Sequence, residues 1–171
     1  AIGAVAIRDS RVEYADSYDT MGAASAGNNH FNTRYKAYLN WLTTNDFVKV
    51  TSNGTYRIFA HDDAAAVGVR ALQIIKNSNS STNTYTNYWV EFRQKFTSNK
   101  WQMNGAGLRW AQNGNQCSLL LDTSPGSASG KNDAAVVIGR TFADNASAIY
   151  IPPIAKGNTV PESLDVVVNL G

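Results

Sequence analysis

The sequence is poor in cysteine and in charge, and each shortage excludes a class of protein. Cys117 is the single cysteine of the 171 residues, so no disulfide can form within the chain. Charged residues make up 16% of the chain, the formal net charge is +2, and no run of lysines or arginines occurs, which argues against nucleic-acid binding. The apolar start, Ala1 to Ile7, is far too short to span a bilayer. We expect neither a nucleic-acid partner nor a membrane span.

What the chain does contain is typical of an extracellular β-protein. Hydrophobic residues make up 43% and aromatic residues 11%, enough for a sizeable core without cross-links. Low charge combined with many serine, threonine, asparagine and glycine residues predicts a secreted, strand-rich domain. Cys117 begins the apolar run Cys117 to Leu121, so we expect it to be buried as a small hydrophobic side chain.

The sequence changes character near residue 45. Before it, apolar side chains recur at helical spacing and predict one amphipathic helix that Asn28 or Asn29 caps; they are Phe31, Tyr35, Tyr38, Leu39 and Leu42. After it the period becomes two. Asn53-Gly54 lies between two alternating runs, which predicts a β-hairpin.

Further strand-like runs follow, separated by linkers rich in turn residues, of which Asn77 to Asn87 is the most biased. The runs are Val67 to Ile75, Tyr88 to Phe96, Gly105 to Trp110, Cys117 to Leu121, Ala135 to Ile138, Ala148 to Ile151 and Leu164 to Leu170. They predict a mainly β fold, an antiparallel, jelly-roll-like β-sandwich over residues 45–171 after a short helical segment over residues 1–44.

Several motifs occur in an order that resembles the carboxy-terminal part of gametolysin-like secreted zinc metallopeptidases. They are Glu13 to Gly22, His30-Phe31-Asn32, Leu39 to Leu42, Asn87 to Gln94, Leu120 to Gly126 and Asp133 to Asp144. Ala15, Asn29 and Asn40 depart from the pattern, which has glycine at these positions.

The resemblance implies that Met21 and Gly22 form the Met turn, in which the methionine is the hydrophobic floor beneath a zinc ion. Taken without the motif, Met21 would be ordinary core filling. The family's zinc motif, His-Glu-x-x-His-x-x-Gly-x-x-His, is absent, since His30 and His61 are the two histidines and neither precedes a glutamate. We expect His30 to pack at the helix start and His61 to lie on a solvated strand end.

The resemblance therefore predicts that residues 1–44 are a remnant of the protease subdomain and that 45–171 form an accessory domain for substrate or surface binding. The chain would be the carboxy-terminal portion of a secreted zinc metalloendopeptidase and would catalyse nothing alone. Zinc, bound by the missing amino-terminal half, would activate the water that attacks the peptide.

Three further sites are candidates. Alternation along Tyr88 to Phe96 predicts that Tyr88, Val90, Phe92 and Phe96 face the core and that Trp89 lies on the other face. Trp89 and Trp101 are predicted to form a platform for an extracellular glycan or protein, with core packing as the alternative. Glu91 is expected to pair with a cation on the same strand face. Asp122, Asp133 and Asp144 border long loops and are candidate calcium ligands, with solvated turn residues as the alternative reading.

A second function class stays open. The chain could be a non-catalytic structural or adhesive subunit outside the cell. The strand-compatible segment Ala1 to Ile7 would then add to a neighbouring subunit's sheet and produce a homo-oligomer or a filament.

Overall fold

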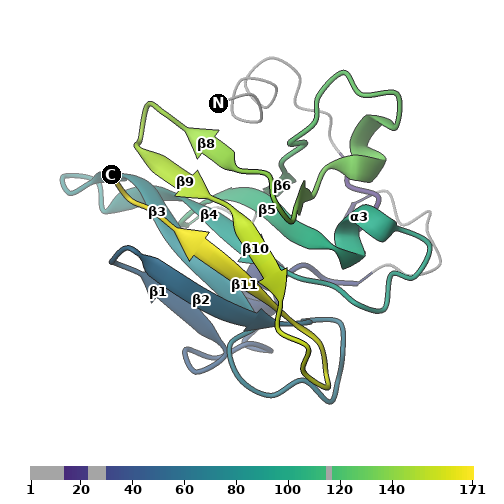
Figure 1. The fold of residues 1–171 in the computed structure, drawn as a ribbon. Helices are drawn as coiled ribbons and strands as arrows, with labels where there is room; N and C mark the ends of the chain where they lie inside the picture. Colours follow the sequence, from purple (N-terminus) through teal and green to yellow (C-terminus); the bar gives the residue numbers. More distant parts are fainter. Residues whose placement is uncertain (1–13, 23–29, 115–116) are drawn as a thin grey trace.

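The protein is mainly β and sandwich-like, as the sequence predicts (Figure 1). The computed structural model describes residues 14–22, 30–114 and 117–171. Within these ranges three short helical elements accompany the strands: α2 (Thr33–Tyr38), α3 (Lys100–Met103) and the 3₁₀ turn η1 (Gly130–Asp133). None of the helices in these described ranges has the length and apolar character needed to cross a membrane.

The first sheet has the strand order β1-β3-β4-β5-β6, and β7 pairs with the beginning of β5. Its strands are β1 (Phe47–Val50), β3 (Ala71–Asn79), β4 (Thr84–Glu91), β5 (Gly105–Gln112), β6 (Ser118–Leu120) and β7 (Val136–Val137). β1 runs parallel to β3, whereas the other pairs are antiparallel. The sheet is therefore mixed and departs from the wholly antiparallel prediction.

The second sheet has the order β10-β11-β2 and packs across the first. Its strands are β10 (Pro153–Lys156), β11 (Ser163–Val168) and β2 (Gly54–Phe59). A small hairpin of β8 (Phe142–Asp144) and β9 (Ile149–Ile151) lies beside it, and Tyr150 bridges to Asn169 just after β11. β8 and β10 lie outside the predicted strand runs, so the sequence patterns missed these two strands.

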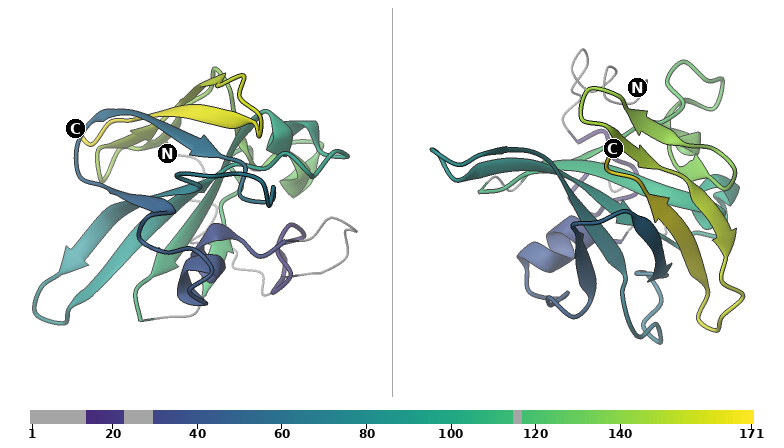
Figure 2. Two further views of the ribbon diagram at one scale, coloured as in Figure 1. Left: turned by 90° about the horizontal axis from the view of Figure 1, so that it is seen from below. Right: turned by 60° about the vertical axis from the view of Figure 1, so that its left-hand side comes forward.

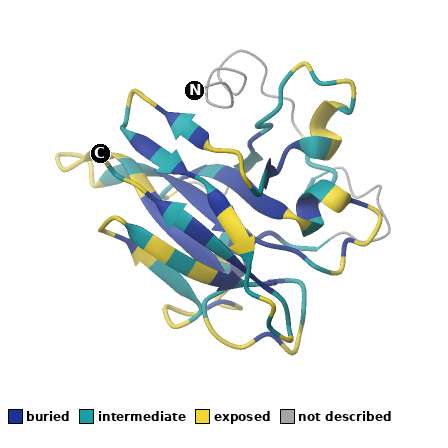
Figure 3. Cartoon of the chain, in the orientation of Figure 1, coloured by how far each residue is buried: buried dark blue, intermediate teal, exposed yellow. Residues whose placement is uncertain are grey.

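The core fills the space between these sheets. Strand alternation points Tyr88, Val90 and Phe92 inward, as predicted, toward Leu164 and Val166 of the second sheet. Figure 3 shows the buried residues along the central strands of the first sheet. Twelve or more such side chains, each contributing about 1.5–3 kcal/mol, make this cluster the main source of stability.

The opposite face of the first sheet carries α2. Both views in Figure 2 show α2 on the side of the sheet away from β11. Asn32 caps this helix, because its side chain accepts a hydrogen bond from Tyr35 N at 2.9 Å. The predicted helix was too long, and Asn28 and Asn29 lie outside the described residues.

Two local predictions are wrong. Asn53-Gly54 does not join a hairpin, because β1 pairs with β3 and β2 pairs with β11, so the turn passes from one sheet to the other. The biased stretch Asn77 to Asn87 is mostly strand, since β3 extends to Asn79 and β4 begins at Thr84. Threonine and tyrosine side chains suit a pleated ladder, and they outweigh the turn-forming composition.

Candidate functional site

Residues 16–22 form the compact turn that contains Met21. Asp16 Oδ1 accepts a hydrogen bond from Tyr18 N at 2.9 Å, and Asp19 Oδ1 accepts one from Met21 N at 2.7 Å. At Gly22 any Cβ would overlap the Asp16 carbonyl oxygen, so only glycine fits. The turn leaves the Met21 side chain 55% exposed. Its role as the floor of a zinc site stays a prediction.

A buried ion network attaches this turn to the first sheet. Arg109 of β5 pairs through Nη1 with Asp16, and its Nε donates to Glu91 Oε1 of β4 at 2.7 Å. Glu91 lies opposite Gly107 in the β4–β5 ladder, so Arg109 is its diagonal neighbour. The expected pairing of Glu91 with a cation is confirmed, but the partner comes from the adjacent strand.

The same network also positions α2. Thr33 donates its backbone N–H and its hydroxyl to Glu91 Oε2, at 2.8 and 2.9 Å. Asp19 Oδ2 accepts the backbone N–H of Asn32 at 2.6 Å. Two carboxylates therefore bind the beginning of the helix, where backbone N–H groups have no partner within the helix. The turn and the helix are fixed to each other and to the sheet.

The histidines lie at the other side of Glu91. His61 is buried. Its backbone N–H donates to Phe92 O at 3.0 Å, and Lys36 Nζ donates to its carbonyl oxygen at 2.5 Å. The prediction of a solvated strand end is therefore wrong. His30 is half-buried, and its ring lies perpendicular to that of His61 with centroids 5.7 Å apart.

The electrostatics of the network favour a neutral His61. Burial lowers the pKa of His61 well below its usual value, although Glu91 Oε2 is 3.8 Å away. Its Nε2 accepts a hydrogen bond from Arg93 Nε at 3.2 Å, which an imidazolium could not do. Burial also lowers the pKa of Lys36, to about 8. Cations therefore approach this histidine from two elements.

The carboxylate at the centre stays ionised. Burial works to raise the pKa of Glu91, but Arg109, Arg93 and the backbone N–H of Thr33 bring it well below its usual value. Burial opposes the charge of Arg109, yet Asp16, Glu91 and Asp19 raise its pKa above the ordinary range. Each charge in the network thus depends on its partners.

Exposed apolar side chains gather on the segment that this network holds. Among the described residues nine large apolar side chains are exposed, and five of them belong to residues 14–41. These five, which we call the apolar docking face, are Tyr14, Met21, Tyr38, Leu39 and Trp41. The helix was expected to bury its apolar side, but the buried residues of α2 are Thr33 and Lys36. The helix turns its polar side to the sheet because that face of the sheet carries the buried charges of Glu91 and Arg109.

The two tryptophan candidates have different fates. Trp89 lies on the predicted face of β4, opposite to the core, but it is 3% exposed. Its ring packs on Phe47 at 5.1 Å between centroids, and Ala37 of α2 packs against the same cluster. The prediction that Trp89 offers its ring to a ligand is wrong, because β1 and α2 cover it. Trp101 is half-buried on α3 and lines a pocket.

The three calcium candidates each have separate hydrogen-bond partners. Asp144 pairs with Lys76 and accepts the Tyr88 hydroxyl at 2.7 Å. Asp122 Oδ1 accepts from Ser124 N at 3.0 Å, and Asp133 Oδ1 accepts from the Ser127 hydroxyl at 2.9 Å. No three His, Cys, Asp or Glu side chains converge on a metal-sized site in the part of the chain that the structure describes. Calcium binding stays a prediction.

Cys117 is exposed, which corrects the prediction of a buried thiol, because β6 begins at Ser118 and the cysteine precedes the ladder. Segment Ala1 to Ile7 lies outside the described residues, so assembly through it stays a prediction.

Comparison with protein-family models, with curated proteins and with solved structures gives no match to this chain. The functional argument therefore depends on the arrangement of residues 14–42 on the sheet.

Proposed function

We propose that this chain is the carboxy-terminal part of a secreted zinc metalloendopeptidase, in which the β-sandwich presents residues 14–42 to the zinc-bearing part of the enzyme. The observation that supports this most is the inverted polarity of the segment. Asp16, Asp19, Thr33 and Lys36 face the sheet and its ion network, whereas the five residues of the apolar docking face are exposed, although Tyr18 and Leu42 are buried. A segment that only covered a sandwich would bury its apolar side chains against the sheet and expose its charged ones.

The inversion has an energetic consequence. Burying Arg109 and Glu91 carries a desolvation cost that their pairing only partly offsets, and leaving large apolar side chains in water forgoes about 25 cal/mol per Å². A second polypeptide that covers the apolar docking face would remove these side chains from water and so gain the hydrophobic free energy that their exposure forgoes. Exposed apolar groups gathered on one short segment are typical of such an interface.

The sandwich supplies the rigid support. Its core of buried side chains is drawn from residues 50–168 and uses none of the described residues 14–22 and 30–42. The domain can therefore keep the Met turn at a fixed position whether or not the rest of the enzyme is bound. In the complete enzyme it would hold the turn beneath the metal and leave its own surface for a macromolecular substrate.

The two histidines of this chain do not fit a zinc ion by themselves. His61 is committed to Arg93 through Nε2, and the charges of Lys36 and Arg93 lie close to it, which disfavours a dication. His30 would be a single ligand. The zinc ligands and the general base would therefore belong to the other part of the enzyme, and no catalytic step is assigned to this chain.

The decisive measurement is zinc per chain, by elemental mass spectrometry, on the protein isolated from its own source. We expect near one equivalent, with peptidase activity that a chelator abolishes, and neither property in the recombinant 171-residue chain. A native protein without zinc and without peptidase activity would contradict the proposal. If that protein were also oligomeric by light scattering, it would favour the structural or adhesive subunit.

A variant pair tests the apolar docking face itself. In the native enzyme, Trp41→Ser should lower peptidase activity and loosen the association, because a 57% exposed indole would otherwise be covered at the interface. Val67→Ser, at an 80% exposed position on the sandwich, is the matched control and should change neither. Equal behaviour of the two variants would exclude residues 14–42 as the contact surface.

A further inference from the structure

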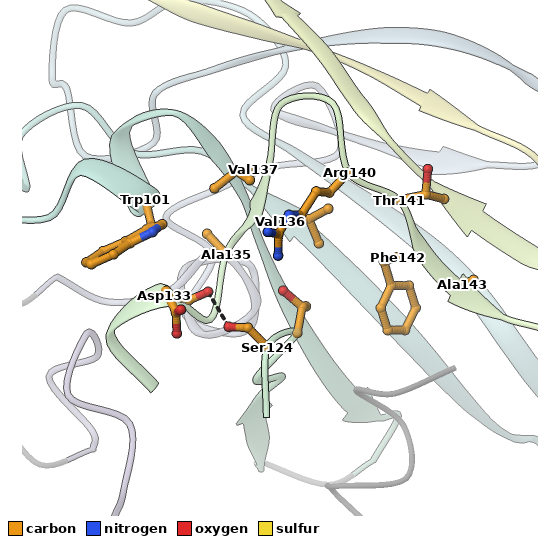
Figure 4. A pocket seen from close by; sticks show the side chains of 11 residues that line it. Trp101, Ser124, Asp133, Ala135, Val136, Val137, Arg140, Thr141, Phe142 and Ala143 are labelled. Atoms are coloured by element: carbon orange, nitrogen blue, oxygen red, sulfur yellow. Dashed lines mark hydrogen bonds between the residues drawn. The ribbon is translucent and has the colours of Figure 1, made fainter. Parts of the chain in front are cut away.

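A pocket of about 170 Å³ lies beside α3, between the loop over residues 122–135 and strands β7 and β8. Figure 4 shows Trp101 on one side of it and Phe142 on the other, with the Arg140 side chain between them. Pockets for whole drug-sized ligands have volumes of about 300–1,000 Å³. This pocket therefore suits a single group about the size of one amino-acid residue.

Arg140 is the distinctive group in the pocket. A turn places it, since Arg140 N donates to Val137 O at 3.0 Å and Gly139 adopts a positive φ of 87°. Its guanidinium makes no hydrogen bond or ion pair with any residue that the structure describes, whereas Arg57 and Arg109 each pair with a carboxylate. A guanidinium offers five N–H donors in a planar fork that matches a carboxylate.

Three of the other polar groups of the pocket already have hydrogen-bond partners. The Thr123 hydroxyl donates to Ala134 O and the Ser124 hydroxyl donates to Asp133 O, both at 2.8 Å. The Asp133 carboxylate accepts the Ser127 hydroxyl. Among the lining residues, Arg140 is the cation, and it offers the planar fork of donors that a carboxylate needs.

The apolar walls decide between two sources of a carboxylate. Val136 and Phe142 are buried and line the pocket together with Trp101. A sugar acid would place hydroxyl groups against these walls, and hydroxyls without partners cost free energy there. The last residue of a peptide combines a carboxylate with an apolar side chain, so both of its parts find a match.

We propose that this pocket binds the carboxy-terminal residue of an extended peptide. The terminal carboxylate pairs with Arg140, and the apolar side chain fills the space between Trp101 and Phe142. No residue of the pocket belongs to the apolar docking face, so this binding and the zinc content of the native protein are independent of each other.

The test is a nitrogen-15 NMR titration of the 171-residue chain with acetyl-Gly-Gly-Leu, as the free acid and as the amide. We expect the free acid to shift the Trp101 indole signal and the amides of residues 133–142, and the amide form to bind at least about tenfold more weakly. Arg140→Met should cause a similar loss. Arg140→Lys should fall between, because it keeps the charge but loses the fork.

Lys49→Met is the matched control, since Lys49 is exposed on the edge strand β1 and its removal changes the net charge equally. Binding should be unchanged in this variant. Thermal melts of all variants should coincide, because Arg140 is exposed and its side chain makes no hydrogen bond or ion pair with a described residue. Equal affinity for acid and amide, or unchanged binding by Arg140→Met, would overturn the proposal. Tighter binding of glucuronic acid at the same residues would overturn it in favour of an acidic sugar.

Discussion

The two faces of the first sheet are packed differently. The inner face, toward the second sheet, is apolar, whereas the outer face, which carries α2, holds the buried ion network. Leu108 and Arg109 are neighbours on β5 and are both buried, but Leu108 enters the apolar core and Arg109 enters the ion network. An apolar core tolerates many arrangements of similar volume, whereas each buried charge requires a particular partner at a particular place. The inner face therefore supplies stability, and the outer face specifies where residues 14–22 and 30–42 lie.

The largest loss of stability is expected from Arg109→Met. It leaves Asp16 and Glu91 buried without their cation, which should cost about 3–5 kcal/mol in the free energy of unfolding. Urea denaturation measures the loss. Native-state hydrogen exchange should show the Asn32 and Thr33 amides, whose acceptors are Asp19 and Glu91, opening locally before the sandwich unfolds.

Leu108→Ala is the matched comparison for Arg109→Met. It should cost a similar amount, about 2–5 kcal/mol, through a cavity in the core. Here the Asn32 and Thr33 amides should exchange without any selective local opening. If both variants opened the segment to the same degree, the two faces would not have separate roles.

Acid should destabilise the ion network on the outer face at a higher pH than it affects the apolar core. Because the pKa of His61 is lowered in the folded state, the unfolded chain binds more protons below about pH 6.5, and stability falls as the pH drops through that value. The slope should be up to about 1.4 kcal/mol per pH unit for this group. His61→Gln should remove most of it between pH 6.5 and 5, and identical slopes in variant and wild type would contradict the role of His61.

Tyr18 tests one neutral contact of the same segment. Its hydroxyl donates to Lys131 O at 2.8 Å and accepts from Asn99 Nδ2 at 3.1 Å, so Tyr18→Phe should cost about 1 kcal/mol. Burial raises the pKa of Tyr18 to about 12, so its contribution is intact below about pH 10 and is lost as the pH rises to about 12. Alkaline denaturation of the variant should lack that loss.

The smallest effect is expected from Arg57→Met. Arg57 binds Asp165 with two hydrogen bonds, at 2.7 and 2.8 Å, but it is exposed on the outside of the second sheet. Water solvates both charges whether or not they pair, so the urea midpoint should not move measurably. A loss approaching that of Arg109→Met would show that burial is not what separates the two ion pairs.

Sequence patterns predicted the inner face well and the outer face poorly. Alternation from Tyr88 to Phe92 identified the core side of β4 correctly, because a strand with period two needs no distant information. The same pattern implied that Trp89 faces solvent, since nothing local shows that Phe47 and α2 cover it. His61, beside two aspartates, was misplaced for the same reason, because the residues that contact it, Lys36 and Arg93, come from distant parts of the chain.

The sequence by itself determined the class of fold, most of the strands and the Asp-rich turn around Met21, because propensity, alternation and glycine positions act over a few residues. Only the tertiary structure decided that β2 pairs with β11, about a hundred residues later, and that Arg109, Glu91 and Asp16 share one buried site. A charged residue in a strand is ordinarily solvated, and its burial depends on partners that the fold brings from distant segments.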